Sequence, residues 1–145
     1  MSADPLAAAL VEHAYLEGDF LLRSGRRSRY YLDKYRFETR PDLLGPLGER
    51  IAAGVREHAP DATRLAGPEL GAVALAAAAS LESGLPFLIV RKAAKEYGTA
   101  KRVEGPYEEG GADALARHAV RLRPLFRAGE LLSGAKSPAK RMVEP

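Results

Sequence analysis

Apolar and polar residues alternate near the start of the chain in a way that predicts a helix followed by a hairpin. Asp4 and Pro5 form a typical helix start, with an acidic N-cap before a proline in the first turn. Apolar residues then recur at every fourth position, and we expect this helix to end at Gly18. Residues 20–37 have apolar and aromatic ends around a Ser-Gly turn, which predicts a β-hairpin.

The middle of the chain alternates between helical patterns and short apolar runs. A helix is expected from residue 41 to Pro60, with a stripe of leucine, isoleucine and valine. The segments 63–67 and 86–90 are candidate strands, and the second is apolar on both faces, as is typical of an interior parallel strand. Between them, residues 72–83 are almost wholly apolar and predict a buried helix. Strand, helix and strand in this order indicate an α/β sheet.

After residue 109 the pattern becomes weaker. Residues 112–119 predict a short helix, and residues 120–126 predict an edge strand, because Pro124 excludes a central place in a sheet. Residues 133–145 have little to bury and are expected to form a flexible tail.

Composition places the chain among globular proteins. It has 145 residues, of which 46% are hydrophobic and 28% charged, enough for one domain with one core. No apolar run approaches the roughly 20 residues of a membrane span, and the acidic N-terminal segment does not resemble a secretory signal. The absence of cysteine excludes disulfides, thiolate metal sites and cysteine nucleophiles. We therefore expect a cytoplasmic protein that does not bind membranes.

Residues 91–102, which we call the basic arm, form one of the clusters of positive charge in the chain. The arm holds five basic residues and a single acid, Glu96, and Gly98 loosens its backbone. Arginine offers a planar fork for phosphate and lysine a compact charge, so the arm is a candidate anion-binding loop. From composition alone, a solvated basic loop is the favoured explanation. The net charge of +3 is modest, which favours local anion sites over a continuous nucleic-acid surface.

Three segments together resemble orotate phosphoribosyltransferase. They are FLLRSGRRSRYYLD (20–33), AGPELGAVALA (66–76) and VRKAAKEYGTAKRVEG (90–105), and they occur in the order and at the distances found in that family. The resemblance covers roughly residues 4–109. On this basis the chain is identified as a member of the family, which attaches ribose 5-phosphate to orotate in pyrimidine biosynthesis.

The resemblance implies a fold, an activity and partners. The fold would be α/β, with a type I phosphoribosyltransferase-like parallel sheet, flanking helices and an N-terminal hood. The activity would be that of a glycosyltransferase that uses 5-phosphoribosyl 1-diphosphate (PRPP) with Mg²⁺ and orotate, and yields orotidine 5′-phosphate and diphosphate. A homodimer is implied, in which the basic arm of one subunit reaches the active site of its partner. The expected domain comprises residues 1–132, with a hood (1–40), a core part (41–109), a C-terminal part (110–132) and a tail (133–145).

The resemblance also implies roles for individual residues. Lys92 and Lys95 are expected to be catalytic, and Tyr30 and Tyr31 are expected to shield the orotate ring from the hood. The turn at 68–71 would lie beside the diphosphate. The residues expected to bind PRPP are Arg23, Arg91, Lys92, Lys95 and Tyr97. Packing across the hairpin is the alternative for the two tyrosines, since aromatic cross-strand pairs are common. No residue is expected to bind a metal directly, because the three histidines lie far apart in the sequence.

One part of the family pattern is missing. The family carries an apolar strand that ends in two acids, followed by a loop rich in threonine and glycine, of the V-x-E-D-V-x-T-T-G-G type. The loop wraps the 5-phosphate with backbone N–H groups at a helix N-terminus. This chain contains no such segment, and its only adjacent pair of acids, Glu108 and Glu109, follows Gly-Pro-Tyr. We hypothesise that an internal deletion joined two similar stretches near residues 108–111, so the sheet is expected to be incomplete, the protein unstable and turnover undetectable.

Three classes of function follow. The first is the transferase, by family. The second is a catalytically inactive remnant, or a dimerisation partner of an intact subunit. The third, a basic nucleic-acid-binding module, is disfavoured because the chain lacks zinc ligands, an aromatic RNA platform and a recognisable helix-turn-helix.

Overall fold

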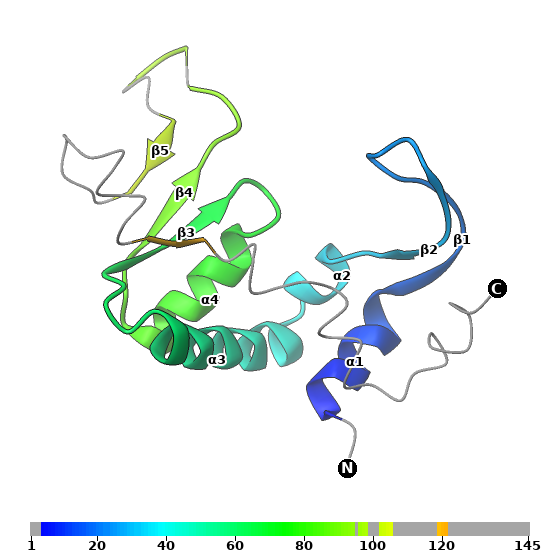
Figure 1. Cartoon of the computed structure of the whole chain (residues 1–145), viewed down its shortest axis with the longest axis horizontal. Helices are drawn as coiled ribbons and strands as arrows, with labels where there is room; N and C mark the ends of the chain where they lie inside the picture. Colours follow the sequence, from blue (N-terminus) through cyan, green and yellow to red (C-terminus); the bar gives the residue numbers. More distant parts are fainter. Residues whose placement is uncertain (1–3, 95, 99–101, 106–118, 122–145) are drawn as a thin grey trace. The chain divides into compact units, whose positions relative to one another are not determined.

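The computed structural model describes residues 4–94, 96–98, 102–105 and 119–121. The chain divides into two compact units between Leu43 and Leu44, and each unit is described by itself. In chain order, the elements are α1 (Pro5–Ala14), β1 (Tyr15–Leu21), β2 (Arg27–Leu32), α2 (Tyr35–Glu38), α3 (Pro41–His58), β3 (Arg64–Pro68), α4 (Val73–Ser83), β4 (Phe87–Val90), β5 (Val103–Glu104) and β6 (Ala119–Arg121). Figure 1 colours the elements along the chain and labels all of them except β6.

The helix start that the sequence predicts is confirmed, but the predicted end is wrong. The side chain of Asp4 accepts a hydrogen bond of 3.0 Å from the backbone N–H of Leu6. Helix α1 ends at Ala14, and Gly18 lies inside strand β1. Tyr15 begins that strand opposite Leu32 of β2, so ladder hydrogen bonds replace the next helical turn.

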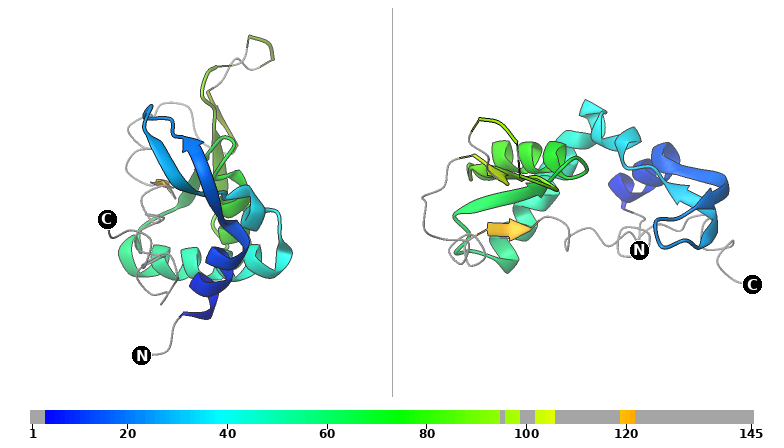
Figure 2. Two further views of the ribbon diagram at one scale, coloured as in Figure 1. Left: turned by 90° about the vertical axis from the view of Figure 1, so that its right-hand side faces the viewer. Right: turned by 90° about the horizontal axis from the view of Figure 1, so that it is seen from above.

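Strands β1 and β2 form an antiparallel two-stranded hairpin, which confirms the predicted hairpin (blue in Figure 2). The pairing shifts between Glu17 and Phe20, where a bulge or similar irregularity interrupts the ladder. The second strand is shorter than expected. A Tyr35–Glu38 helical turn, α2, follows it, and Asp33 Oδ1 accepts the Tyr35 N–H at 3.1 Å. Such local side-chain bonds favour turns over strand continuation.

The second unit contains a four-stranded sheet with the order β5-β4-β3-β6. Strands β3 and β4 are parallel neighbours, which confirms the predicted strands at 63–67 and 86–90. Strand β6 pairs parallel to β3 at one edge, so the expected edge strand is present at 119–121, while residues 122–126 lie outside the described residues. Residues 112–118 of the predicted short helix and the predicted tail also lie outside them.

Strand β5 was not predicted. It is only two residues long and pairs antiparallel with β4, with Val103 opposite Val90 and Glu104 opposite Ile89. Its position turns the basic arm into the loop of a β4–β5 hairpin. Two residues are too few to show a period of two, so no local pattern predicts this strand.

Helix α4 confirms the predicted buried helix and explains its many alanines. It packs against β3 and β4 and ends at Gly84, which adopts a left-handed conformation with a φ of 73°. A Cβ added at Gly67 of β3 would lie 2.7 Å from the carbonyl oxygen of Ala72 and 2.9 Å from the Cβ of Ala76. Small residues on both sides therefore allow the helix to approach the sheet closely. Leu81, in contrast, is 87% exposed.

Helix α3 confirms the predicted helix between residue 41 and Pro60, and it includes Pro46. It lies beside α4 within the second unit (Figure 1), and a Cβ added at Gly48 would come within 2.8 Å of the backbone of Ala78. Leu47, Leu65 and Leu88 are fully buried and mark the core of this unit. Among the described residues, no helix is long and apolar enough to cross a membrane.

Candidate functional site

The carboxyl ends of the parallel strands β3 and β4 meet at one edge of the sheet. Pro68 pairs with Val90 in the ladder, and the Glu69 N–H donates to the Val90 carbonyl at 2.8 Å. The turn that leads from β3 to α4, which includes a cis peptide bond between Glu69 and Leu70, therefore lies beside the start of the basic arm. Ligands of open α/β sheets bind at this kind of edge.

Glu69 connects the turn to the arm directly. Its carboxylate Oε1 accepts a hydrogen bond of 2.8 Å from the backbone N–H of Lys92, which lies 23 positions later in the sequence. The two segments are thus held together both by the strand ladder and by this side chain.

The two ends of the basic arm are held side by side. The Arg91 N–H donates to the Arg102 carbonyl at 2.8 Å, and Arg102 Nε donates to the Arg91 carbonyl at 3.3 Å. Gly105, just beyond, has a φ of 120°, and a Cβ there would lie 2.9 Å from Leu88 Cδ2 and 3.0 Å from the Phe87 carbonyl oxygen. Only glycine fits this position without strain, so the end of the arm is as closely specified as its beginning.

Three of the residues expected to bind PRPP lie in the described part of the arm. Lys92 is exposed, Tyr97 is 76% exposed, and Arg91 is half-buried. Lys95 lies outside the described residues. Arg91 and Lys92 begin the arm immediately next to the 68–71 turn, so the structure brings together the two motifs that the resemblance assigns to the diphosphate.

The residues expected to act from the hood, Arg23 on PRPP and Tyr30 and Tyr31 on orotate, lie in the first unit. Arg23 is exposed in the turn of the hairpin, and Tyr30 and Tyr31 are exposed on β2. The ring of Tyr30 stacks on Tyr15 at a centroid distance of 5.9 Å, and that of Tyr31 lies 5.5 Å from Phe20. Because neighbouring residues of a strand point to opposite faces, the two tyrosines occupy different sides of the hairpin.

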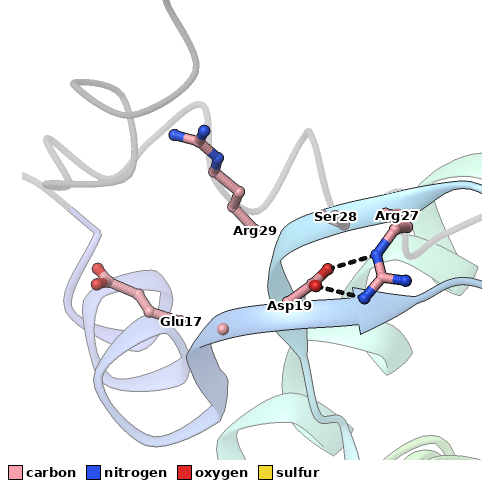
Figure 3. Close-up of a pocket in the computed structure, with 6 residues that line it drawn as sticks. Glu17, Asp19, Arg27, Ser28 and Arg29 are labelled. Atoms are coloured by element: carbon pink, nitrogen blue, oxygen red, sulfur yellow. Dashed lines mark hydrogen bonds and ion pairs between the residues drawn. The ribbon is translucent and has the colours of Figure 1, made fainter.

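An open pocket lies elsewhere, along the hairpin (Figure 3). Its lining residues are Glu17, Gly18, Asp19, Arg27, Ser28 and Arg29. Arg27 binds both carboxylate oxygens of Asp19 across the two strands, with Nε 2.9 Å from Oδ1. This pair lowers the pKa of Asp19 and raises that of Arg27.

The hairpin pocket is a poor anion site compared with the sheet edge. Its lining has two acids and two arginines, so its formal charges cancel, and the Asp19–Arg27 pair is solvent-exposed. Sequence reasoning missed this pocket, because the pairing of Asp19 with Arg27 depends on the irregular register of the hairpin. We therefore place the candidate site at the ends of β3 and β4.

The described residues contain no group of three or more His, Cys, Asp or Glu side chains that could hold a metal ion. Protein-bound Mg²⁺ commonly keeps one or two carboxylates and takes its other ligands from water and substrate phosphates. The residues present thus fit a magnesium ion that arrives with a phosphate ligand better than one bound by the protein alone.

Comparison with known proteins extends these observations. No family model matches the chain. An orotate phosphoribosyltransferase from Methanocella arvoryzae is 54% identical over 97 residues, which cover 64% of this chain and 51% of that protein. One from Thermococcus gammatolerans is 41% identical over 133 residues, which cover 90% of this chain and 70% of that protein. The chain thus spans between about half and about 70% of the length of these relatives.

A solved structure agrees with these relatives. Mycobacterium tuberculosis orotate phosphoribosyltransferase in complex with PRPP is 25% identical to the chain and superposes with a TM-score of 0.52, over 70% of this chain and 55% of that one. This likeness confirms the predicted α/β fold class, and the relatives confirm the resemblance carried by the three motifs. The chain belongs to the orotate phosphoribosyltransferase family.

Proposed function

We propose that the chain serves the orotate phosphoribosyltransferase reaction, in which the phosphoribosyl group of PRPP passes to orotate and diphosphate is released, as a step of pyrimidine biosynthesis. The observation that carries this proposal is the meeting of the 68–71 turn and the basic arm at one sheet edge, tied by the bond from Lys92 to Glu69. The relatives named for this activity support it, as does the family member solved with PRPP.

The chemistry explains why cations belong at this edge. When the bond from ribose C1 to the diphosphate oxygen breaks, its electron pair leaves with the diphosphate. Lys92 and Lys95 would stabilise that growing negative charge, and Arg91 and Tyr97 would hold the diphosphate in place. Arg23, Tyr30 and Tyr31 would contact donor and orotate from the hood. Since Tyr30 and Tyr31 lie on opposite faces of β2, we expect only one of them to touch the orotate ring.

The missing acid pair and threonine-rich loop limit what this chain does by itself. Without them, the chain lacks the groups expected to bind the ribose hydroxyls and the 5-phosphate of PRPP. The basic residues expected to bind its diphosphate are present. We therefore expect the chain to bind diphosphate and PRPP with Mg²⁺, and to show no detectable turnover. A magnesium ion carried by the donor, a homodimer and a cytoplasmic location complete the proposal.

Calorimetric titration with PRPP and Mg²⁺ tests the binding. Replacing Lys92 by alanine should weaken binding by about ten- to a hundredfold, because a hydrogen bond to a charged group contributes roughly 1.5–3 kcal/mol. Replacing Arg56, an exposed cation on α3, removes the same charge away from the site and should leave the affinity unchanged. Absence of binding by the unaltered protein, or equal losses in both variants, would contradict the assignment.

A coupled assay with orotate, PRPP and Mg²⁺ tests the expectation that the chain alone shows no turnover. We expect no orotidine 5′-phosphate above background from the chain alone. A rate similar to that of the intact Methanocella arvoryzae relative, measured in parallel, would show that the chain is a complete enzyme.

A role as the dimerisation partner of an intact subunit is the second candidate, and the missing signature favours it. In a mixed dimer the basic arm of this chain would serve a site whose phosphate-binding loop belongs to the other subunit. An intact family member in which the lysine corresponding to Lys92 is replaced by alanine should have little turnover by itself. Mixing it with this chain should restore turnover. If the chain and the intact member elute separately and activity stays absent, this candidate fails.

A further inference from the structure

Glu69 presents a carboxylate at the edge of the sheet where a diphosphate is expected to bind. A negative charge there repels an anionic ligand, so its presence calls for a physical explanation. Glu69 is half-buried, its own N–H is bonded to Val90, and its Oε1 accepts the backbone N–H of Lys92 at 2.8 Å. Glu69 is therefore held at two points, by its backbone N–H and by its carboxylate.

We propose that Glu69 is a positioning residue that fixes the direction in which the basic arm leaves the sheet, an inference that rests on the proposed function. The Arg91 N–H is bonded across the hairpin to the Arg102 carbonyl. Lys92 is the next residue, and because neighbouring N–H groups of a strand point to opposite sides, its N–H points toward the β3 side, where the Glu69 carboxylate accepts it. The carboxylate thus orients the peptide from which the Lys92 side chain extends.

The strength of the contact supports a positioning role. A hydrogen bond whose acceptor is ionised is roughly twice as strong as a neutral one. A distance of 2.8 Å lies in the range of such bonds. Lys92 is exposed, so packing does little to hold it, and this bond is the contact that joins it to the turn. Removing the acceptor should let the peptide between Arg91 and Lys92 rotate and should spread the lysine over more directions.

A competing role predicts the opposite result. If the carboxylate occupied the Lys92 N–H in place of the diphosphate, its removal would free a donor and strengthen binding. Replacement by glutamine, which keeps an oxygen acceptor of similar reach but no charge, distinguishes the two roles together with alanine. Glu82, exposed on α4, offers a matched control in which the same charge is removed from the same unit.

Hydrogen exchange in the free protein tests the contact without any ligand. In Glu69→Ala the Lys92 amide should exchange about tenfold faster, and in Glu69→Gln within about threefold of the unaltered protein. The Leu65 amide, which is bonded to the Pro86 carbonyl at 2.9 Å within the same sheet, should not change. Unchanged exchange of Lys92, or faster exchange of both amides, would overturn the positioning role.

Titration with inorganic diphosphate and Mg²⁺ then tests the consequence. We expect the dissociation constant to rise about tenfold in Glu69→Ala, to rise no more than about threefold in Glu69→Gln, and to stay unchanged in Glu82→Ala. A lower dissociation constant in Glu69→Ala would overturn the proposal in favour of competition. If the unaltered protein binds no diphosphate, the proposed function fails, and the exchange pattern alone decides whether Glu69 orients the arm.

Discussion

Glu38 is a carboxyl group that the fold of the first unit buries. It lies in α2 and is 3% exposed, and its Oε1 has no hydrogen-bond partner among the described residues. Burial raises the pKa of Glu38 from 4.5 to about 7, with the nearby Lys34 acting in the opposite direction and Asp33 adding to the rise. A carboxyl in such a place stays neutral in the folded protein under mildly acidic conditions.

This burial predicts that the protein becomes less stable as the pH rises. Because the pKa of Glu38 is higher in the folded than in the unfolded chain, its contribution is complete below pH 4.5 and is lost as the pH rises through about 7. The loss amounts to at most about 3 kcal/mol in the free energy of unfolding. Urea unfolding at about pH 5 and about pH 8 should show this decrease, and Glu38→Gln should remove it.

Glu49, exposed on α3, provides the control for that measurement. Glu49→Gln should keep the same dependence of unfolding free energy on pH as the unaltered protein. An identical pH dependence in Glu38→Gln and the unaltered protein would mean that the carboxyl of Glu38 is not neutral in the fold.

At the scale of the elements, close contacts between small residues hold the second unit together. The Gly67 position in β3 lies against α4, as does Gly48 of α3, and in both cases an added Cβ would come within 3 Å of the helix. Gly54, in α3, differs because an added Cβ there would meet nothing within 4 Å. The two kinds of glycine therefore predict opposite effects of substitution.

Gly67→Ala should lower the free energy of unfolding by about 1–3 kcal/mol, because the new methyl group overpacks the contact between β3 and α4. Gly54→Ala should raise it by about 0.5–1 kcal/mol, since alanine favours the interior of a helix. Urea unfolding of the two variants beside the unaltered protein measures both effects. Stabilisation by Gly67→Ala would mean that a Cβ at this position does not meet Ala72 and Ala76 as closely as the structure indicates.

The elements that the sequence predicted correctly are those with a clear local pattern. The capped start of α1, the stripe of α3 and the apolar run of β4 each depend on neighbouring residues alone. The predicted end of α1 at Gly18 was wrong because cross-strand pairing of Tyr15 outweighed the local glycine signal. Long-range partners of this kind leave no trace in a local pattern.

In the candidate site, too, contacts between segments far apart in the sequence could not be predicted. The motifs placed Arg91 and Lys92 in one candidate site, and the sheet edge brings them next to the turn. The bond between Glu69 and Lys92 could not be predicted, because it depends on the register of β3 and β4. The roles of Arg23, Tyr97 and the catalytic lysines in binding or catalysis stay predictions.

At the scale of the whole molecule, the missing signature is the main difference from the family pattern. The described sheet has four strands, and the acid pair with its threonine-rich loop is absent from the sequence. Leu81 on α4 is exposed, as is Leu70 in the turn beside the arm. We expect such apolar surface to be covered when the missing segment is present, and to favour aggregation when it is not.

Restoring the segment tests this view. Insertion of the corresponding stretch of the Methanocella arvoryzae relative at Glu108 should bring turnover from undetectable to measurable, because it supplies the wall for the 5-phosphate. The same insertion with both signature acids changed to alanine provides the control and should remain inactive. A folded, PRPP-binding insertion variant without turnover would show that the deletion hypothesis is wrong.

The β4–β5 hairpin has a further consequence for how a ligand arrives. The basic arm is anchored covalently at two adjacent strands, and the bond between the Arg91 N–H and the Arg102 carbonyl closes it. A doubly anchored tether samples a much smaller volume than a free tail, so the effective concentration of its cations at the sheet edge stays high even in the empty protein. Capture of a polyanion should therefore be rapid, and should slow steeply as ionic strength rises.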